Sequence, residues 1–422
     1  MNRPLRDPVC ACDDPKRTKG LISVETAFAR LAEVVSPLAG TEHVPLSQAA
    51  GRVLALSVSA RAPLPPFDNA AMDGYALRAA DLAGSGPWTL PVLDRIAAGE
   101  MPAGPACGAV RIFTGAPLPD GADTVVMQEV VCRSPETVTL TDRPKRGDHV
   151  RKAGEIAKAG VELVAAGRRL DPRRIAAIAA AGQGQVTVTR RPRVALVVTG
   201  DEICTTAEMR GPAAIWDVNG PLFHAAMAET GAEVVLHHAP DDRNATRCLL
   251  AQLAETVDLI VTTGGISVGE EDHVRPAMEA LGTRITFAGV AIKPGKPVCH
   301  GRLGHAHWLG LPGNPVSAFV TWHLFGRYIM NALQGIDQNQ KPARHVACQI
   351  PLHHRAGRAE YRLARRDPAA PTGAQIVLCP DTRASSHITW LAQADGLICI
   401  PAQSGDIPAG TELAFLPFGQ PD

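Results

Sequence analysis

The sequence predicts a multidomain α/β plus β protein, and three observations support this class. The chain has 422 residues, enough for roughly two to four domains rather than one. Residues 192–333 alternate unbroken apolar runs with amphipathic segments, which is typical of a parallel sheet covered by helices on both faces. Residues 44–150 and 342–422 instead carry short β-type runs between glycines and prolines. We therefore expect a central three-layer α/β domain with a mostly parallel sheet, a small β-rich domain and a C-terminal β-barrel-like domain.

Local signals predict the elements of the first half. Residues 1–20 are polar and proline-containing, so we expect a disordered tail. Ser23 is a predicted N-cap, because apolar residues follow it at helical spacing. Asp171 is a second predicted N-cap, with Pro172 in the first position of a helix over 171–181. The β-type runs between these helices are Val53–Val58, Val110–Phe113, Thr124–Val131 and Thr137–Leu140.

Strands and helices then alternate through the α/β region. The predicted strands are Arg193–Val198, Glu233–Leu236, Asp258–Val261 and Trp308–Leu311. The predicted helices lie near 220–230, 244–255, 273–281 and 316–330. Ligands of such sheets bind beyond the carboxyl ends of the strands, so the loops at those ends are the first place to look for a site.

Changes in sequence texture suggest the domain boundaries. We expect a tail over 1–20 and a discontinuous linker or helical domain made of 21–58 and 157–190. The small β-rich domain is expected over 59–156, the α/β domain over 191–335 and the C-terminal β domain over 340–422.

Composition excludes several classes of function. Lys+Arg 42 balances Asp+Glu 42, so nucleic acid or an anionic membrane is not expected as the main partner. No apolar run approaches a membrane span, and the first residues lack the apolar core of a signal peptide, so we expect a cytoplasmic protein. The cysteines form no CxxC pair and are expected to be reduced thiols, while the role of Cys10 and Cys12 stays open.

Glycines, carboxylates and lysines concentrate at the predicted strand ends. Strand 193–198 runs into Thr199-Gly200-Asp201-Glu202, and strand 258–261 runs into a Gly264-Gly265 loop that ends at Asp272. Glycine loops let backbone N–H groups approach a phosphate, lysines neutralise its charge, and carboxylates hold Mg²⁺ against its oxygens. The other segments of this set are Asp217-Val218-Asn219, Asp241-Asp242, Lys293-Pro294-Gly295-Lys296-Pro297 and Leu311-Pro312-Gly313-Asn314-Pro315. Together they predict a site for a phosphorylated ligand with a divalent cation.

Each piece alone has an ordinary alternative. Gly200-Asp201 and Gly264-Gly265 are each compatible with an ordinary turn. Asp241 is compatible with a helix cap, and the two lysines with a solvated surface. Only their joint occurrence on one strand-end face favours a site. The histidine pairs His237-His238 and His353-His354, and His305 and His307, lack the partners of a complete metal site.

The β-rich region carries three specific segments: FDNAAMDGYA at 67–76, RIFTGAP at 111–117 and VVMQE at 125–129. With the strand-end motifs, which follow in order, they resemble the molybdopterin molybdenumtransferases, that is, the MoeA-type proteins and the related terminal domain of gephyrin. The resemblance spans about residue 21 to the C-terminus.

The resemblance implies a four-domain homodimer that cleaves AMP from adenylyl-molybdopterin and inserts molybdate into the dithiolene, with Mg²⁺ or a similar cation. It implies an active site between the α/β domain of one subunit and the β-domain of the other. A molybdopterin adenylyltransferase and molybdoenzymes are the implied further partners.

The resemblance also implies roles for individual residues. The catalytic positions are Asp73, Thr114, Glu202, Asp241 and Asp272, of which Asp241 and Asp272 are the expected metal ligands. The substrate-binding positions are Gly200, Asp217, Asn219, Gly264, Gly265, Ser267, Gly269, Lys293, Lys296, Pro312, Gly313, Pro315 and Ser386.

Three positions depart from the family pattern. Ala70 stands where many members have Ser, Gly289 where many have Lys, and Ile156 where the family usually has Asp. These departures motivate an alternative function, a non-catalytic carrier or chaperone of molybdopterin or its mature cofactor. A molybdopterin adenylyltransferase is a third hypothesis, and the additional β-domain argues against it.

Overall fold

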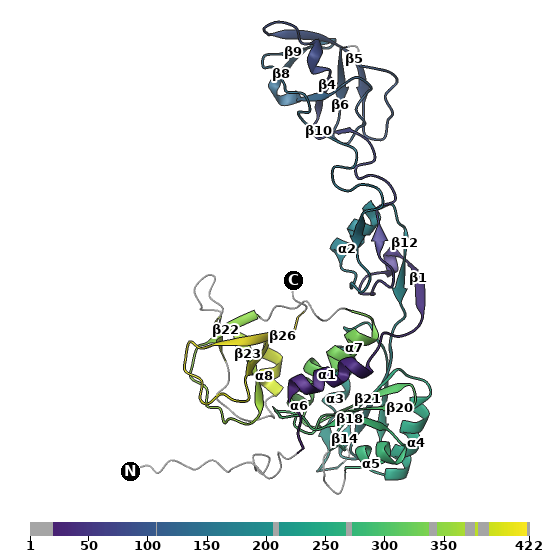
Figure 1. Ribbon diagram of the computed structural model, residues 1–422, viewed down its shortest axis with the longest axis vertical. Helices are drawn as coiled ribbons and strands as arrows, with labels where there is room; N and C mark the ends of the chain where they lie inside the picture. Colours follow the sequence, from purple (N-terminus) through teal and green to yellow (C-terminus); the bar gives the residue numbers. More distant parts are fainter. Residues whose placement is uncertain are drawn as a thin grey trace. The chain divides into compact units, whose positions relative to one another are not determined.

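The computed structural model describes residues 20–106, 108–205, 211–266, 272–336, 344–367, 376–378 and 388–419 (Figure 1). The chain divides into two units, one formed by residues 1–42, 51–53 and 189–422 and the other by 43–50 and 54–188. The predicted tail lies outside the described residues, apart from Gly20.

A six-stranded sheet forms the centre of the first unit. Its order is β16 (Glu233–Ala239), β13 (Arg193–Thr199), β17 (Leu259–Thr263), β21 (Ala306–Leu311), β20 (Cys299–Leu303) and β18 (Arg284–Ala288). The first four strands are parallel, β20 runs antiparallel to β21, and β18, antiparallel to β20, runs in the same direction as the first four. The sheet is therefore mostly parallel, as predicted, but β18 and β20 were missed because polar residues such as His300 and Arg302 interrupt their apolar pattern.

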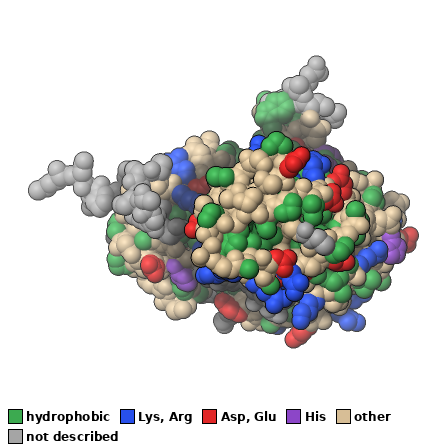
Figure 2. Space-filling view, turned by 90° about the horizontal axis from the view of Figure 1, so that it is seen from above, with side chains coloured by type: hydrophobic (Ala, Val, Ile, Leu, Met, Phe, Trp, Pro, Cys, Tyr) green, Lys and Arg blue, Asp and Glu red, His purple; other side chains and the backbone are tan. Residues whose placement is uncertain are grey.

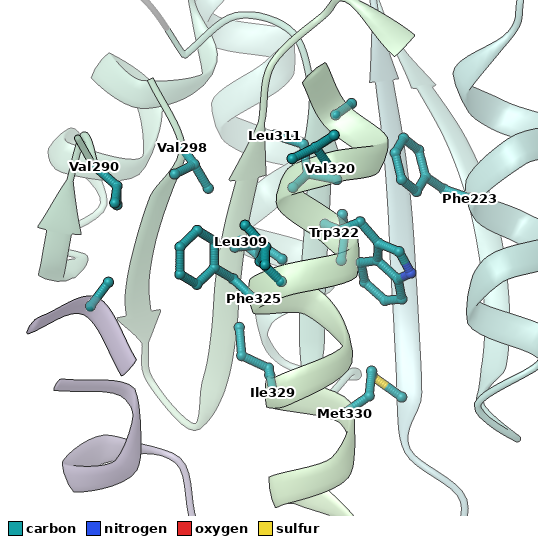
Figure 3. Close-up of a cluster of buried hydrophobic side chains, with 14 of the residues drawn as sticks. Phe223, Val290, Val298, Leu309, Leu311, Val320, Trp322, Phe325, Ile329 and Met330 are labelled. Atoms are coloured by element: carbon teal, nitrogen blue, oxygen red, sulfur yellow. The ribbon is translucent and has the colours of Figure 1, made fainter. Parts of the chain in front are cut away.

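Helices cover both faces of this sheet, which confirms the three-layer prediction. Along β13, Val194 and Leu196 point to one core while Ala195 and Val197 point to the other. The first core contains residues of α1 (Val24–Val34), α3 (Asn219–Ala228), α6 (Pro315–Thr321) and α7 (Arg327–Leu333). The second contains residues of α4 (Arg243–Ala254) and α5 (Val274–Ala280). Figure 3 shows the first core around Trp322 and Phe325, which lie in a π-helical turn, Trp322–Gly326, between α6 and α7.

The N-terminal helix α1 belongs to this unit. Ser23 caps it as predicted, its side chain accepting a hydrogen bond from the Thr26 N–H at 3.1 Å. Val24, Ala27 and Leu31 then pack into the first core of the α/β domain. The apolar stripe of the helix is therefore buried against the α/β sheet, and residues 1–42 belong to the same compact unit as that sheet, while the domain bounds predicted from the sequence stay a prediction.

A second sheet in the same unit forms the C-terminal β domain. Its order is β19 (Ile292–Lys293), β23 (Ala359–Arg366), β24 (Ile376–Leu378), β22 (Arg344–Cys348), β26 (Glu412–Pro417) and β25 (Gly396–Ile400). Strand β25 also pairs with β23, so the pairings from β23 round to β25 close on themselves, as expected for a barrel-like domain. The helix α8 (Ile388–Gln393) was not predicted. Strand β19 lies between β18 and β20 in the chain, so the α/β region contributes one strand to this sheet.

The β-rich unit contains a third six-stranded sheet. Its order is β7 (Thr124–Met127), β4 (Gly74–Leu77), β6 (Ala109–Ile112), β5 (Trp88–Ile96), β9 (Thr137–Leu140) and β8 (Val131–Arg133). The strand predicted over Thr124–Val131 is broken by the 3-10 turn Gln128–Val130, because the N–H of Gln128 donates to the carbonyl of Asp73. Short strand β3 (Asn69–Ala70) pairs with β10 (Val150–Arg151) beside this sheet.

A separate core in this unit joins segments that are distant in sequence. Val44, Leu54 and Val58 pack with Val164 and with residues of α2 (Pro172–Ala180), β12 (Gln185–Thr189) and nearby turns. Helix α2 begins as predicted, because Asp171 accepts from the Arg174 N–H at 2.8 Å. The strand predicted over Val53–Val58 is wrong: only Val58 lies in a strand, β2 (Val58–Ser59), which pairs with β11 (Glu162–Val164). Strand β1 (Thr41–Pro45) pairs with β12.

Two further features concern the surface. Within the described part of the chain, no helix is long and apolar enough to cross a membrane. Acidic and basic side chains are interspersed on the face drawn in Figure 2, in keeping with the balanced charge of the sequence.

Candidate functional site

The ends of β13, β17 and β21 lie next to one another, and their loops approach at backbone distance. Gly264 has φ +88°, and a Cβ there would lie 2.8 Å from the Thr199 Oγ1 atom. A Cβ on Gly313 would lie 3.6 Å from the Gly264 Cα atom. The predicted substrate-binding residues Gly264 and Gly313 are therefore brought together, and Gly264 must be glycine both for its φ and for this close approach.

Gly265 connects the same loop to the start of helix α5. Its φ is +63°, and its carbonyl accepts hydrogen bonds from the N–H groups of Val274 and Arg275, at the start of α5, at 3.1 and 3.2 Å. A small hollow opens here, lined by Thr199, Pro240, Asp241, Thr246, Gly265, His273 and Val274. Asp272 directly precedes His273, so the predicted acidic positions Asp241 and Asp272 belong to one strand-end face.

Asp241 is linked to the first glycine loop. The N–H of Asp201 donates to the Asp241 Oδ2 atom at 3.1 Å, and the N–H of Asp241 donates to the Asp201 Oδ1 atom at 3.2 Å. The helix-cap alternative for Asp241 is wrong, because Asp242 caps α4 by accepting from the Ala245 N–H at 2.7 Å.

Gly200 and Glu202 shape the same loop. Gly200 has φ +127°, and a Cβ there would lie 2.5 Å from the Glu202 Oε2 atom. The Glu202 carboxylate therefore folds back over Gly200, and its side chain stays exposed to solvent.

Asp217 and Asn219 form a polar corner beside the Gly313 loop. The Asp217 side chain accepts from the Gly220 N–H at 2.8 Å and lies 3.3 Å from the His238 Nε2 atom. Asn219 donates through Nδ2 to the Gly313 carbonyl at 2.8 Å. The Asn219 Oδ1 atom is buried and has no hydrogen-bond partner among the described residues, which leaves an acceptor for a ligand donor.

His238 was not predicted as a site residue. The adjacent pair His237-His238 read as two opposite faces of a strand, and that reading holds for β16. Side chains alternate along the strand next to β13, so one histidine of the pair points toward the Asp-x-Asn loop. That alternation was the available sequence signal.

The two lysines occupy a loop that starts in the C-terminal sheet. Lys293 is the last residue of β19, and its Nζ atom lies 3.6 Å from the Glu360 Oε1 atom. The backbone of Lys296 is fixed through its carbonyl, which accepts from the Val290 N–H at 3.0 Å. Gly295, between them, has φ +103°, and a Cβ there would lie 2.3 Å from the Thr321 Cγ2 atom of α6. For Lys293, the solvated-surface alternative is wrong, because this lysine is half-buried and paired.

Pro312 and Pro315 flank the loop after β21. Pro312 is buried, and Pro315 takes the first position of α6. Asn314 caps that helix, since its Oδ1 atom accepts from the Ser317 N–H at 3.2 Å. Ser267, Gly269 and Ser386, also predicted to bind substrate, lie outside the described residues.

The β-rich unit holds a second polar constellation around Asp73. The Asp73 Oδ1 atom accepts from both the backbone N–H and the hydroxyl of Thr114, each at 2.8 Å. The pKa of Asp73 is lowered most by the hydrogen bond from the Thr114 N–H and next by the one from the Thr114 hydroxyl. The charge of Arg111 adds to the effect. The predicted pair Asp73 and Thr114 is therefore in direct contact, with the carboxylate held ionised.

Arg111 supports this constellation and was not singled out from the sequence. Its guanidinium lies 5.0 Å from the ring centre of Tyr75 and 5.1 Å from that of Phe113, and it donates to Gln128. Its Nη1 atom is buried without a hydrogen-bond partner among the described residues. The signal was present in the motif RIFTGAP itself, where Arg111 shares a strand face with Phe113.

Comparisons with known proteins cover nearly the whole chain. Family models match in succession: the MoeA N-terminal region (domain I and II) over residues 22–182, a probable molybdopterin binding domain over 195–332, and the MoeA C-terminal region (domain IV) over 345–418. Molybdopterin molybdenumtransferase 2 of Mycobacterium tuberculosis is 35% identical over 381 residues, covering 88% of this chain and 93% of that protein.

The chain belongs to the MoeA family of molybdopterin molybdenumtransferases.

Further relatives agree with this membership. The molybdopterin molybdenumtransferase of Haemophilus influenzae is 32% identical over 404 residues, covering 94% of this chain and 99% of that protein. The crystal structure of the molybdopterin biosynthesis MoeA protein from Pyrococcus horikoshii OT3 matches with a TM-score of 0.81 at 26% identity, covering 94% of this chain and 100% of that one. The resemblance and the fold class predicted from the sequence are both confirmed.

The three departures from the MoeA pattern have distinct structural settings. Ala70 is buried in β3. Gly289 has φ +93°, and a Cβ there would lie 2.7 Å from the Leu21 Cδ2 atom, so a lysine would need both a strained backbone and a shift of that side chain. Ile156 is 74% exposed and lies in a bend of the chain.

The residues of the strand-end face fit a divalent cation of the magnesium type. Mg²⁺ prefers one or two carboxylates and completes its coordination with water and substrate phosphates. Asp241 and Asp201 supply such hard oxygen atoms, held near each other by their backbone hydrogen bonds. Within the described ranges, no group of three or more His, Cys, Asp or Glu side chains is placed to hold a metal.

Proposed function

We propose that this member of the MoeA family is a Mg²⁺-dependent molybdopterin molybdenumtransferase. It binds adenylyl-molybdopterin, releases AMP and inserts molybdate into the dithiolene. The observation that carries this proposal is the convergence of Gly264, Gly313 and Asp241 at one edge of the sheet, in a chain related over its length to molybdopterin molybdenumtransferases. The glycine loops allow backbone approach to a pyrophosphate.

The chain's own residues divide the work. Asn219 offers a buried acceptor to a donor group of the ligand, and Asp217 is held in place by Gly220 and His238. Lys293 and Lys296 neutralise oxyanion charge. Asp241 and Asp272 are the residues that would hold the cation, with Asp201 next to Asp241 as a further oxygen donor. When bound, the cation would supply charge stabilisation on the phosphate oxygens.

Asp73 and Thr114 complete the proposal from the β-rich unit. The Thr114 hydroxyl donates its proton to the ionised Asp73 carboxylate, and it would turn away from Asp73 to donate to an oxygen of molybdate when that substrate binds. We propose that these residues act in a homodimer, on the α/β site of the partner subunit. Cys132, Cys248, Cys299 and Cys399 are free thiols, which supports a reducing, cytoplasmic location.

The carrier hypothesis is the second candidate, and Ile156 is the observation that favours it. An exposed isoleucine stands at the position where the family usually has an acidic residue. A chain that binds adenylyl-molybdopterin but lacks a needed oxygen ligand would act as a carrier.

One assay separates the two functions. The purified chain is incubated with adenylyl-molybdopterin, molybdate and Mg²⁺, and both bound molybdopterin and released AMP are quantified. AMP release with formation of active cofactor supports the transferase. Tight binding without AMP release supports the carrier, and the absence of binding contradicts both.

A further inference from the structure

Glu360 is the centre of a buried charged cluster in the C-terminal sheet. It is 4% exposed and lies on β23. Its Oε1 atom accepts from the Arg362 Nε atom at 2.9 Å, and its Oε2 atom lies 2.9 Å from the His354 Nδ1 atom. The Nζ atom of Lys293 makes the third contact, at 3.6 Å from Oε1.

The cluster is anchored on its far side. Arg362 also donates to the carbonyl of His353, and the His354 N–H donates to the Asp406 Oδ1 atom at 3.0 Å. Burial raises the pKa of Glu360, but the hydrogen bonds from Arg362 and His354, with the charges of Arg362 and Lys293, outweigh it and lower the pKa. The carboxylate is therefore ionised and fixed in orientation, with one oxygen facing Lys293.

The backbone aligns the same two residues. Strand β19 pairs in parallel with β23, and Lys293 is the register partner of Glu360. The Ala359 N–H donates to the Ala291 carbonyl at 2.9 Å just before this pair. The side chain of Lys293 nevertheless remains 30% exposed, so its ammonium group is held by Glu360 and stays accessible to a ligand.

We infer that Glu360 is a positioning residue that holds the ammonium group of Lys293 toward an oxyanion at the strand-end site. The inference rests on the proposed function, in which Lys293 binds substrate. Arg362 and His354 already satisfy both carboxylate oxygens, so the stability of the sheet does not require the third contact. That contact is the one that joins the C-terminal sheet to the lysine loop.

A double-mutant cycle tests whether Glu360 acts through Lys293. The variants are Glu360→Gln, Lys293→Met and the double variant, assayed for the KM and kcat of AMP release from adenylyl-molybdopterin. We expect Glu360→Gln to raise KM roughly three- to tenfold and to change kcat roughly twofold at most, because a displaced lysine weakens binding more than the chemical step. In the Lys293→Met background, the same change should add less than about a twofold effect. Equal effects in both backgrounds would overturn the inference.

Asp258→Asn is the matched control for a purely structural role. Asp258 is also a buried carboxylate, paired with Arg190 at 2.6 Å, but it precedes β17 and so lies at the opposite end of the strands from the site. It should lower the thermal unfolding temperature and leave KM unchanged. If Glu360→Gln does not fold, Glu360→Asp takes its place in the cycle. Because aspartate keeps the negative charge, the expected rise in KM over the wild type is smaller than the rise expected for Glu360→Gln.

A second measurement does not depend on turnover. Trace acetylation of all lysines at one pH, read by peptide mass spectrometry, reports how firmly each amine is held. Glu360→Gln should raise the labelling rate of Lys293 roughly threefold or more relative to the other lysines, and Asp258→Asn should not. An unchanged Lys293 rate would overturn the inference even if the enzyme is active. Absence of AMP release in the wild type, with the labelling change present, would instead reject the proposed function alone.

Discussion

The backbone N–H groups of Asp201 and Asp241 each donate to the other residue's carboxylate, at 3.1 and 3.2 Å. This reciprocal pair ties the loop after β13 to the loop before α4 and holds one oxygen edge of each carboxylate. The remaining oxygen positions can face a cation. The Asp241 carboxylate therefore holds the loop after β13, whereas its neighbour Asp242 caps α4.

The first prediction uses these neighbours as a matched pair. Asp241→Asn should lower AMP release by roughly a hundredfold, because an amide supplies no negative charge to a cation or to the transition state. Asp242→Ala should cost about 1 kcal/mol of unfolding free energy through loss of the N-cap, with turnover within roughly twofold of wild type. Steady-state AMP release and chemical denaturation measure the two effects. A loss of stability without loss of activity in Asp241→Asn, and the opposite result in Asp242→Ala, would contradict the site.

The second prediction concerns the pH dependence of Asp73. Its pKa is lowered by the Thr114 N–H and hydroxyl, so the carboxylate stays ionised well into the acid range. Thr114→Val removes the hydroxyl donor, moves the pKa back toward its ordinary value and therefore shifts the acid limb of the pH–rate profile to higher pH. Thr114→Ser keeps the hydroxyl and should keep the wild-type limb. An acid limb that stays in place in Thr114→Val would exclude Asp73 as the group responsible.

The third prediction concerns the exposed Ile156. Ile156→Asp should lower the Mg²⁺ or molybdate concentration for half-maximal AMP release by roughly tenfold, the effect of about 1.4 kcal/mol of added binding. Glu155→Gln should change little, because the Glu155 side chain is engaged with the Lys152 N–H at 2.8 Å and an amide oxygen can still accept that bond. Ion titrations of the wild type and both variants measure this. Loss of activity in Glu155→Gln alone, with no effect of Ile156→Asp, would make Glu155 the substitute ligand.

The fourth prediction follows from two buried histidines of the α/β domain. Burial is the main cause that lowers the pKa of His300 to about 3, and the charge of His307 adds to it. Burial is also the main cause that lowers the pKa of His307 to about 4, and the charge of Arg302 adds to it. Their unfolded-state pKa values are near 6.5, so below that pH the unfolded chain binds the extra protons. Each histidine therefore costs about 1.4 kcal/mol of stability per pH unit as the pH falls from 6.5 toward its folded pKa.

The variant that checks this is His300→Phe, which removes the more deeply buried titrating group next to Phe287. Its unfolding free energy should fall less steeply than that of the wild type between pH 6.5 and 4. Urea unfolding at several pH values gives both slopes. Identical slopes would show that His300 does not titrate in the unfolding reaction.

The fifth prediction tests the shared site in the proposed dimer. Asp73→Asn and Asp272→Asn should each inactivate the homodimer, because each removes a carboxylate from one half of the site. Mixed dimers of the two variants should regain one intact site, and so about half of the wild-type activity per dimer. Differently tagged chains, purified through both tags, confirm the mixing. Inactive mixed dimers would contradict a site shared between subunits.

The sequence predicted elements best where burial decides the pattern. Strands β13, β17 and β21 are buried on both faces, and their apolar runs were read close to their actual limits. The caps Ser23 and Asp171 were also predictable, because a cap is a local hydrogen bond. Strand β20 was missed because His300 and Arg302 break its apolar run.

The residues of the candidate site also differ in how far the sequence alone could predict them. The glycines and carboxylates at the strand ends were predictable, because parallel strands bring consecutive loops to one edge. Arg111, His238 and Glu360 were not, because their roles depend on partners that the folded chain brings from other strands. The surroundings of Ile156 were not predictable either, because its N–H donates to the distant Leu64 carbonyl at 2.9 Å, just after the turn in which the Glu155 N–H donates to the Lys152 carbonyl.

The most direct test of the account is the rate of AMP release from adenylyl-molybdopterin with and without molybdate, at saturating Mg²⁺. The account predicts release by the wild type that depends on molybdate and is accompanied by active cofactor, and its loss in Asp241→Asn with binding retained. Stoichiometric binding of adenylyl-molybdopterin by the wild type, with no AMP release under any molybdate concentration, would contradict it.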